Sequence, residues 1–272
     1  MAAQGVVVIT GGAGGMGLAC AERMAGPGRT LVLADVSSER LDEAARALAD
    51  RGSPVECVAG DLTAPEIVDR LARVAADAGR LEALVHTAGL SPTMASGERI
   101  VEVNLVATER LLDAFLPLAG EGTAVVLIAS QSAHLAKGAA TDEINAILDA
   151  PLAGDAAKRL VEAGVDLNPG AAYSFSKLGV VRAAVRLAPA WGERGARIVS
   201  LCPGIIDTGM GRQEEASQPF MATIIERTPL RRKGSADEIA KAVAFLCSDA
   251  ASFVSGTDLL VDGGSTGAVL AV

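Results

Sequence analysis

The sequence predicts an α/β protein built on a doubly wound parallel sheet with helices on both faces. Short apolar runs alternate with amphipathic segments of helical length along most of the 272 residues, a pattern typical of a parallel sheet that is covered on both sides. Hydrophobic residues make up 50% of the chain, which is enough for a large core. Because we find no internal repeat or low-complexity linker, we expect a single domain over residues 1–272.

Seven apolar runs have the length and composition of buried strands. In order, they are Val6–Thr10, Thr30–Val36, Val55–Ala59, Ala83–His86, Ala124–Ala129, Arg197–Cys202 and Asp258–Val261. The amphipathic stretches expected to form helices are Met16–Ala25, Ser38–Asp50, Ala64–Asp77, Arg99–Ala119, Ala171–Trp191 and Ser235–Ser248. Two capping boxes support helix starts, one formed by Thr63 with Glu66 and one by Ser235 with Glu238.

One region breaks this alternation. At about residues 133–170, before the helix that contains Tyr173, the chain has no strand pattern. Two short helices are expected there, Thr141–Ala150 and Asp155–Ala163, and Pro151 and Gly154 separate them. The segment follows the carboxyl end of a central strand, where open α/β sheets bind ligands. We therefore expect a helical insert beside the ligand site.

Charge and cysteine content exclude several classes of function. The net charge of -9 and the pI of about 4.8 argue against a nucleic-acid partner and give no reason to expect a membrane surface as a partner. No apolar stretch is long enough to span a bilayer, and the N-terminus lacks a signal-peptide pattern. The four cysteines lie far apart and there are only two histidines. We expect reduced, partly buried thiols, no metal site and a cytoplasmic location.

A glycine-rich turn joins the first strand to the first helix. It reads Thr10-Gly11-Gly12-Ala13-Gly14-Gly15-Met16-Gly17. Glycines let the backbone approach a pyrophosphate closely, and the helix N-terminus offers free N–H groups to it. The loop alone leaves two registers open, because Gly12, Gly14 and Gly17 match GxGxxG while Gly11, Gly15 and Gly17 match TGxxxGxG. The strand before it and the helix after it predict a Rossmann-type dinucleotide site.

Asp35 follows near the end of the second strand, at a distance along the chain that suits a contact with the adenosine ribose. A carboxylate there accepts hydrogen bonds from the ribose hydroxyls and repels a 2′-phosphate, which favours NAD over NADP. Arg40 argues in the other direction, because it offers a cation to such a phosphate. The alternative for Asp35 is a turn-forming or helix-capping role before Ser37 and Ser38.

Tyr173 and Lys177 are four residues apart on an expected helix, so their side chains share one face. A phenol ordinarily titrates near pH 10, and a neighbouring ammonium together with a cationic nicotinamide ring favours the phenolate. Such a tyrosine can exchange the proton of an alcohol as hydride is transferred. A pair with this spacing also occurs by chance on surface helices, but Tyr173 is the only tyrosine in the chain.

Two further polar residues are candidates for the same site. Ser130 follows the fifth strand at its carboxyl end, where a hydroxyl can bind a substrate oxygen, and Ser132 is its rival. Either serine could instead cap a turn. Asn104 lies inside the fourth helical region, where a buried amide is usually structural. Its functional alternative is to hold a water that links Lys177 to solvent.

Taken together and in order, these residues resemble the short-chain dehydrogenase/reductase family over nearly the whole chain. The resemblance implies a catalytic set of Asn104, Ser130, Tyr173 and Lys177. The cofactor contacts that it implies are Gly11, Gly15, Met16, Gly17, Asp35, Asp61, Leu62, Ala88, Gly89, Tyr173, Lys177, Pro203, Ile206 and Thr208. It also implies hydride transfer between NAD and a small-molecule secondary alcohol or ketone, and a homodimer or homotetramer.

The chain departs from the family pattern at two points. His86-Thr87 stands where members usually carry two asparagines, so any bracing of the central sheet by amides must differ here. Ser130 and Tyr173 are 43 residues apart, a longer gap than is typical. This insertion resembles the bacterial 3α-hydroxysteroid dehydrogenase/carbonyl reductase subgroup, which implies a hydroxysteroid or other alicyclic substrate. Two alternatives on the same fold are a non-catalytic NAD-binding sensor or scaffold, and an epimerase or dehydratase that retains its cofactor.

Overall fold

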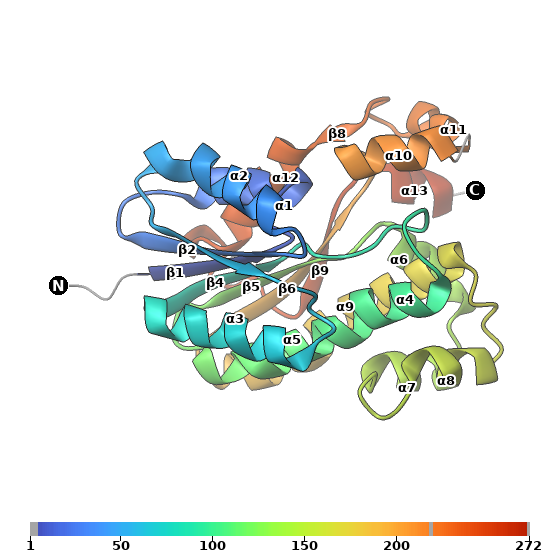
Figure 1. The fold of residues 1–272 in the computed structure, drawn as a ribbon. Coiled ribbons are helices and arrows are strands. Elements are labelled where there is room, and N and C mark those ends of the chain that lie inside the picture. The colour runs from blue at the N-terminus through green and yellow to red at the C-terminus, as the bar shows by residue number, and fades with distance from the viewer. Residues whose placement is uncertain (1–4, 218–219, 271–272) are drawn as a thin grey trace.

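A seven-stranded parallel sheet forms the centre of the molecule in a computed structural model that describes residues 5–217 and 220–270 (Figure 1). The strand order is β3-β2-β1-β4-β5-β6-β9. The strands are β1 (Gly5–Thr10), β2 (Arg29–Asp35), β3 (Val55–Ala59), β4 (Arg80–His86), β5 (Ala124–Ile128), β6 (Arg197–Pro203) and β9 (Thr257–Val261). All seven predicted strands and the doubly wound parallel sheet are thus confirmed.

Helices cover both faces of this sheet (Figure 1). One face carries α1 (Gly15–Met24), α2 (Ser38–Leu48) and α12 (Ala236–Leu246). The other carries α3 (Pro65–Ala78), α4 (Gly97–Val101), α5 (Ala107–Phe115) and α9 (Pro169–Gly192). Side chains of successive strand residues point to opposite faces, so Val6 and Val8 join one buried cluster while Val7 and Ile9 join the other. The central strands are apolar throughout because both of their faces are buried.

The two outermost strands are less buried than their apolar sequences predict. In β3, Glu56 and Cys57 are exposed, and in β9, Thr257 and Leu260 are exposed. Edge strands have a neighbour on one side only, so their side chains receive less cover. The expectation of a partly buried thiol is therefore wrong for Cys57, while Cys20 and Cys202 are buried and all four cysteines are free thiols.

One of the two expected capping boxes forms. Ser235 accepts a hydrogen bond from the backbone N–H of Glu238, and the Glu238 carboxylate binds the backbone of Ser235 in return. The box predicted for Thr63 and Glu66 is wrong, because α3 begins at Pro65 with Ala64 as its N-cap. Proline favours the first helical position and forces an extended conformation on the residue before it. The Thr63 hydroxyl instead donates to the Asp61 carboxylate.

The expected helix Arg99–Ala119 is not a single α-helix. A π-helical turn, Glu102–Val106, separates α4 from α5, and a short 3-10 turn, Leu116–Leu118, follows α5. In the π turn the N–H of Ala107 binds the carbonyl of Glu102, five residues back. Such wide turns often mark functional sites, and this one contains Asn104.

The insert forms three short helices, α6 (Ser132–Ala136), α7 (Asp142–Asp149) and α8 (Ala156–Glu162), of which α7 and α8 are the two that we expected. Figure 1 places α7 and α8 beside the end of α9 that begins with Pro169. The insert residues Ile144, Ile147, Leu148 and Leu160 are buried in the core, whereas Val161 is exposed. An ion pair between Arg182 and Asp149 joins α7 to α9. Most of the apolar side chains thus attach the insert to the body.

The segment between β6 and β9 contains elements that the sequence pattern missed. A two-stranded sheet pairs β7 (Ile206–Asp207) with β8 (Gly234–Ser235). The helices α10 (Gly209–Ser217) and α11 (Phe220–Arg227) lie between these strands, and α13 (Ser265–Leu270) follows β9. Within the described residues, no helix is both long and apolar enough to cross a membrane.

Candidate active site

The predicted nucleotide loop lies where the strand order reverses. Thr10 ends β1 and His86 ends β4, and the two residues are partners in adjacent parallel strands. The chain winds from β1 to β2 and β3 on one side of this point, and β4 to β6 lie on the other. Ligands of open α/β sheets bind in the crevice formed at such a point, so the fold places the loop at the correct edge of the sheet.

The backbone of the loop distinguishes the two glycine registers. Gly11 has φ 65° and Gly15 has φ 53°, which is the left-handed region that favours glycine. A Cβ at Gly17 would lie 2.1 Å from the carbonyl oxygen of Gly11. The three glycines with the strictest requirements are therefore those of the TGxxxGxG pattern. The loop has the tight turn and close helix packing that a dinucleotide requires.

Asp35 holds this loop from the neighbouring strand. Its carboxylate accepts hydrogen bonds of 3.3 Å from the N–H groups of Ala13 and Ser37. The Arg40 guanidinium donates to the carbonyl of Ala13, 3.3 Å away. The Asp35 carboxylate and the Arg40 guanidinium thus both bind the backbone of Ala13. The capping role belongs to Ser37, which caps α2 through its hydroxyl.

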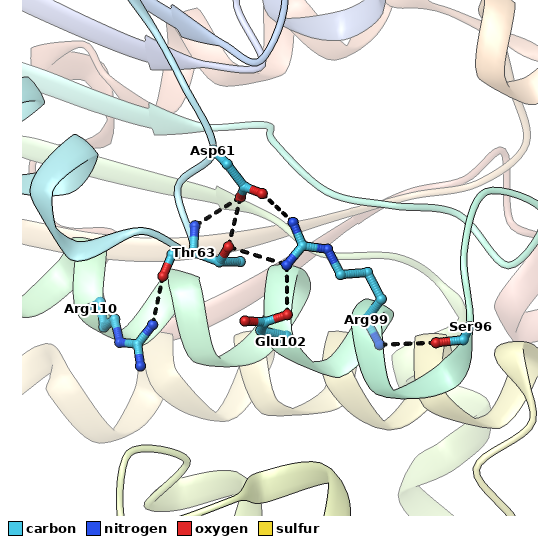
Figure 2. A network of polar contacts seen from close by, with 6 residues as sticks. All are labelled: Asp61, Thr63, Ser96, Arg99, Glu102 and Arg110. Carbon is cyan, nitrogen blue, oxygen red and sulfur yellow. Dashed lines mark hydrogen bonds and ion pairs between the residues drawn. The ribbon is translucent and has the colours of Figure 1, made fainter.

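Asp61 and Leu62, two of the cofactor contacts that the resemblance implies, follow β3. Leu62 is buried, and Figure 2 shows the Asp61 carboxylate held by the N–H and hydroxyl of Thr63 and by the guanidinium of Arg99. Burial raises the pKa of Asp61, but these hydrogen bonds and the charge of Arg99 outweigh it and leave the pKa below its usual value. The network fixes the orientation of a charged carboxylate at the carboxyl end of β3.

Arg99 lies in α4, directly before the π turn that carries Asn104. It binds Glu102 at 2.6 Å and the Thr63 hydroxyl at 3.2 Å, and its backbone N–H is capped by Ser96 (Figure 2). Arg110 of α5 donates to the Thr63 carbonyl at 2.8 Å. The loop after β3 is thus fastened to α4 and α5, an attachment that local sequence patterns do not reveal.

Lys177 is buried between the predicted catalytic residues. Its ammonium donates a hydrogen bond of 2.9 Å to the carbonyl of Ile128, the last residue of β5. It lies 5.9 Å from the centre of the Tyr173 ring. A Cβ at Gly89 would be 3.1 Å from Asn104 Oδ1 and 3.3 Å from Lys177 Nζ. Burial lowers the pKa of Lys177 to about 8, so the side chain carries its charge at neutral pH.

Asn104 faces this ammonium from the π turn. Its Oδ1 accepts from the N–H of Leu90 at 2.7 Å, and its Nδ2 donates to the Leu90 carbonyl at 2.9 Å. The side chain is buried, with 1% of its surface exposed. The carboxamide therefore has a structural role, holding the segment that contains Ala88 and Gly89, while its position beside Lys177 fits the proton relay.

The two candidate serines lie together. Ser130 is buried at the end of β5, and both the N–H and the hydroxyl of Ser132 bind its Oγ, at 3.2 and 3.1 Å. Ser130 is two residues from the carbonyl that holds Lys177. Because the Ser132 hydroxyl donates to Ser130, the Ser130 hydroxyl keeps its own proton for another acceptor.

The segment with Pro203, Ile206 and Thr208, three of the cofactor contacts that the resemblance implies, returns to the glycine loop. Pro203 ends β6, Ile206 is buried in β7, and the Thr208 hydroxyl accepts from the N–H of Gly211 at 3.1 Å. A Cβ at Gly15 would lie 3.8 Å from the Thr208 side chain. Chain segments nearly two hundred residues apart thus lie side by side. Met16, in the first turn of α1, packs against the core on that side.

His86, at the first departure from the family pattern, lies in the centre of this arrangement. Its Nδ1 is 2.7 Å from the Thr10 hydroxyl, and its Nε2 is 2.8 Å from the Thr108 hydroxyl. Burial lowers the pKa of His86 to about 3, and the charge of Lys177 adds to the effect. The bracing of the sheet by an imidazole in place of an amide was missed, although the unusual residue was visible in the sequence.

A second polar cluster joins the insert to the sheet. His134 Nε2 binds Asp258 at 2.8 Å, and the Ser200 hydroxyl donates to the same carboxylate at 2.6 Å. The Cys202 sulfur lies within 4.8 Å of the His134 nitrogen and the Asp258 oxygen, and burial raises the pKa of its thiol. Hydrogen bonds account for the arrangement of His134 and Asp258. His134 is a half-buried partner of the edge strand.

Comparison with known proteins identifies the family. Residues 5–141 match the family model described as short chain dehydrogenase, and residues 159–266 match the one described as enoyl-(acyl carrier protein) reductase. The cis-4-hydroxycyclohexanecarboxylate dehydrogenase of Sinomonas cyclohexanicum is 34% identical, over 97% of each chain. The 3-alpha-hydroxysteroid dehydrogenase/carbonyl reductase of Comamonas testosteroni is 31% identical, over 95% of each chain. The solved structure of levodione reductase shares 28% identity with a TM-score of 0.77, covering 97% of this chain and 98% of that one.

The chain belongs to the short-chain dehydrogenase/reductase family. It is therefore an oxidoreductase that acts on alcohols or ketones with a nicotinamide cofactor. The resemblance to the 3α-hydroxysteroid dehydrogenase/carbonyl reductase subgroup, inferred from the long gap before Tyr173, agrees with the relative from Comamonas testosteroni.

Proposed function

We propose that the protein is an NAD-dependent dehydrogenase/reductase that interconverts an alicyclic secondary alcohol and its ketone in the cytoplasm, as a homodimer or homotetramer. The observation that carries the proposal is the buried ammonium of Lys177, which lies 5.9 Å from the ring of the only tyrosine and beside Asn104. A buried charge is costly unless hydrogen bonds compensate it. Its retention next to a phenol indicates a role in proton transfer.

Each residue of the site has a defined task in this proposal. The bound nicotinamide supplies or accepts the hydride. The Ser130 hydroxyl, whose oxygen already accepts from Ser132, donates to the substrate oxygen. The Tyr173 hydroxyl exchanges a proton with that oxygen, and the Lys177 ammonium stabilises the phenolate electrostatically. Asn104 holds the segment beside Lys177 and completes the path along which the proton is replaced.

Asp35 supports the choice of NAD. Its carboxylate lies at the end of β2, where the adenosine ribose of a dinucleotide is expected, and it would repel a 2′-phosphate. Arg40 does not cancel this effect, because its guanidinium is bound to the carbonyl of Ala13. The alicyclic substrate is proposed from the printed activities of two relatives, which concern a hydroxycyclohexane carboxylate and a 3α-hydroxysteroid.

Turnover with a panel of alcohols tests the proposal. We expect NAD reduction with cyclohexanol, cis-4-hydroxycyclohexanecarboxylate or a 3α-hydroxysteroid, and a loss of about 100-fold or more in kcat for Tyr173→Phe. Ser174→Ala is the matched control, because this neighbouring hydroxyl donates to the Gly170 carbonyl within the same helix. Full activity of Tyr173→Phe would overturn the proposed mechanism. NAD-dependent turnover without net NADH release would favour an epimerase or dehydratase.

The single tyrosine permits a second, spectroscopic test. Ultraviolet difference titration of the NAD complex reports Tyr173 alone, since the chain has no other phenol. We expect ionisation well below pH 10, the midpoint of a free phenol. A midpoint at the free-phenol value would contradict the role assigned to Lys177.

A further inference from the structure

Hydrogen bonds through His86 form a continuous series across the point where the strand order reverses. On one side, Thr10 Oγ1 is 2.7 Å from Nδ1 and accepts from the N–H of Ala88 at 3.3 Å. On the other side, Thr108 Oγ1 is 2.8 Å from Nε2. The three side chains that form this series are buried: Thr10, His86 and Thr108 expose no more than 2% of their surface.

The donors in the chain determine the tautomer of the ring. The Thr108 hydroxyl has one proton and donates it to the backbone carbonyl of Asn104, 2.8 Å away. Nε2 of His86 must therefore donate to Thr108, and Nδ1 must accept from Thr10. A neutral ring satisfies both contacts, whereas a protonated ring would donate from Nδ1 and leave the Thr10 proton without this acceptor. All the hydrogen bonds in this series thus donate in the same direction, from the N–H of Ala88 to the carbonyl of Asn104.

Both ends of this chain reach residues that hold Asn104. Thr108 binds its backbone carbonyl inside the π turn. Ala88 belongs to the segment whose next residues are Gly89, beside Lys177, and Leu90, whose backbone binds the Asn104 carboxamide twice. The backbone of Asn104 is therefore linked to the imidazole of His86 through Thr108, and its side chain is linked through Thr10 and the segment 88–90.

We propose that His86 is a positioning residue that fixes Asn104 relative to Lys177 and so sets the geometry of proton transfer at the active site. This inference rests on the function proposed above, because it assigns Asn104 and Lys177 to the proton relay. His86 is buried and its ring binds only Thr10 and Thr108 among the described hydrogen bonds, so we assign it no contact with the substrate. Its effect passes through the Thr108 hydroxyl and the Asn104 carbonyl. Displacements of about 1 Å in such a network cost up to about 100-fold in rate.

Thr108→Val provides the sharpest test, because it removes the hydroxyl and keeps the side-chain shape. We expect kcat to fall about tenfold or more with little change in the KM of NAD, and the solvent deuterium isotope effect on kcat to rise. Thr108→Ser should restore both values because it returns the hydroxyl. The assay uses the alcohol of the panel above for which the wild-type protein has the highest kcat/KM.

Thr123→Val is the matched control. Thr123 is equally buried and donates a 2.7 Å hydrogen bond to the Leu81 carbonyl, at the opposite end of the sheet. Its loss should reduce thermal stability by a similar amount but leave kcat and the isotope effect at wild-type values. Equal kcat and isotope effects in Thr108→Val and Thr123→Val would overturn the proposal.

Nitrogen NMR tests the hydrogen-bond chain without any turnover. The chain contains only two histidines, so uniformly ¹⁵N-histidine-labelled protein gives two imidazole patterns, and His134→Gln assigns them. We expect His86 to stay neutral with its proton on Nε2 from pH 8 to pH 5, and Thr108→Val to shift the Nε2 resonance. A proton on Nδ1 would overturn the inference. If the wild-type protein gives the expected spectrum but turns over no alcohol of the panel, the proposed function is wrong and the hydrogen-bond arrangement around His86 still holds.

Discussion

Lys177 of α9 donates a hydrogen bond of 2.9 Å to the backbone carbonyl of Ile128, at the end of β5. This contact brings together two residues that are 49 positions apart and places an ammonium two residues from Ser130. The bond compensates part of the cost of burying the charge. Burial nevertheless lowers the pKa of Lys177 into the range of an activity assay.

The pH dependence of turnover should report this ionisation. Burial lowers the pKa of Lys177 to about 8, so the ammonium is present below pH 8 and is lost as the pH rises through that value. We expect kcat/KM for the alcohol to have a descending limb that begins near pH 8. Lys177→Arg keeps its charge to pH 12 and above, so this variant should be slower but should lack that limb. An unchanged limb would assign the ionisation to another group.

Cofactor preference should depend on Asp35. Asp35→Ala removes the carboxylate that repels a 2′-phosphate and leaves Arg40 in place, so the ratio of kcat/KM for NAD to that for NADP should fall at least about tenfold. Asp42→Asn, an exposed acid on α2, is the control for the loss of one negative charge. The ratio of kcat/KM for NAD to that for NADP is measured for the wild type and both variants at the same salt concentration. A preference for NADP in the wild-type protein would refute the assignment of NAD.

The glycine loop should not tolerate a side chain at Gly17. A Cβ there would lie 2.1 Å from the Gly11 carbonyl oxygen, so Gly17→Ala must displace either α1 or the loop. We expect NAD affinity, measured by calorimetry, to fall about tenfold or more, which corresponds to about 1.4 kcal/mol. Gly138→Ala is the matched control, because nothing lies within 4 Å of the added methyl. Wild-type affinity in Gly17→Ala would show that the loop does not contact the cofactor.

Acid stability should reveal the buried imidazole. The pKa of His86 falls from 6.5 in the unfolded chain to about 3 in the folded protein, so between these values the unfolded chain binds one more proton. The free energy of unfolding should fall as the pH drops below 6.5, by about 1.4 kcal/mol per pH unit and about 2 kcal/mol by pH 5. His86→Asn cannot take up this proton.

Urea denaturation at pH 7 and pH 5 measures the difference. The loss between the two pH values should be about 2 kcal/mol smaller in His86→Asn than in the wild-type protein. His134→Gln is the control, because the other histidine pairs with Asp258 at the edge of the sheet. Equal losses in the wild type and in His86→Asn would show that the imidazole is already protonated in the folded state.

Local sequence patterns predicted most of the elements of the fold. Each apolar run that predicts a strand forms one, and the two insert helices begin within a residue of their expected starts, after Thr141 and Asp155. Both signals are local, because an alternation of apolar and polar residues or a capping side chain acts over a few positions. The two wrong predictions also have local causes. Pro65 starts α3 after the expected cap, and the π turn divides the expected helix around Asn104.

The sequence by itself determined the sheet, the glycine turn and the set of candidate residues, because these depend on composition and spacing along the chain. Only the tertiary structure decided that Ile128 holds the Lys177 ammonium, that Arg99 holds Asp61, and that one imidazole links Thr10 to Thr108. These contacts join residues from 22 to 76 positions apart. They arise where parallel strands end at a common edge, and neither a periodicity nor a motif specifies which side chains meet there.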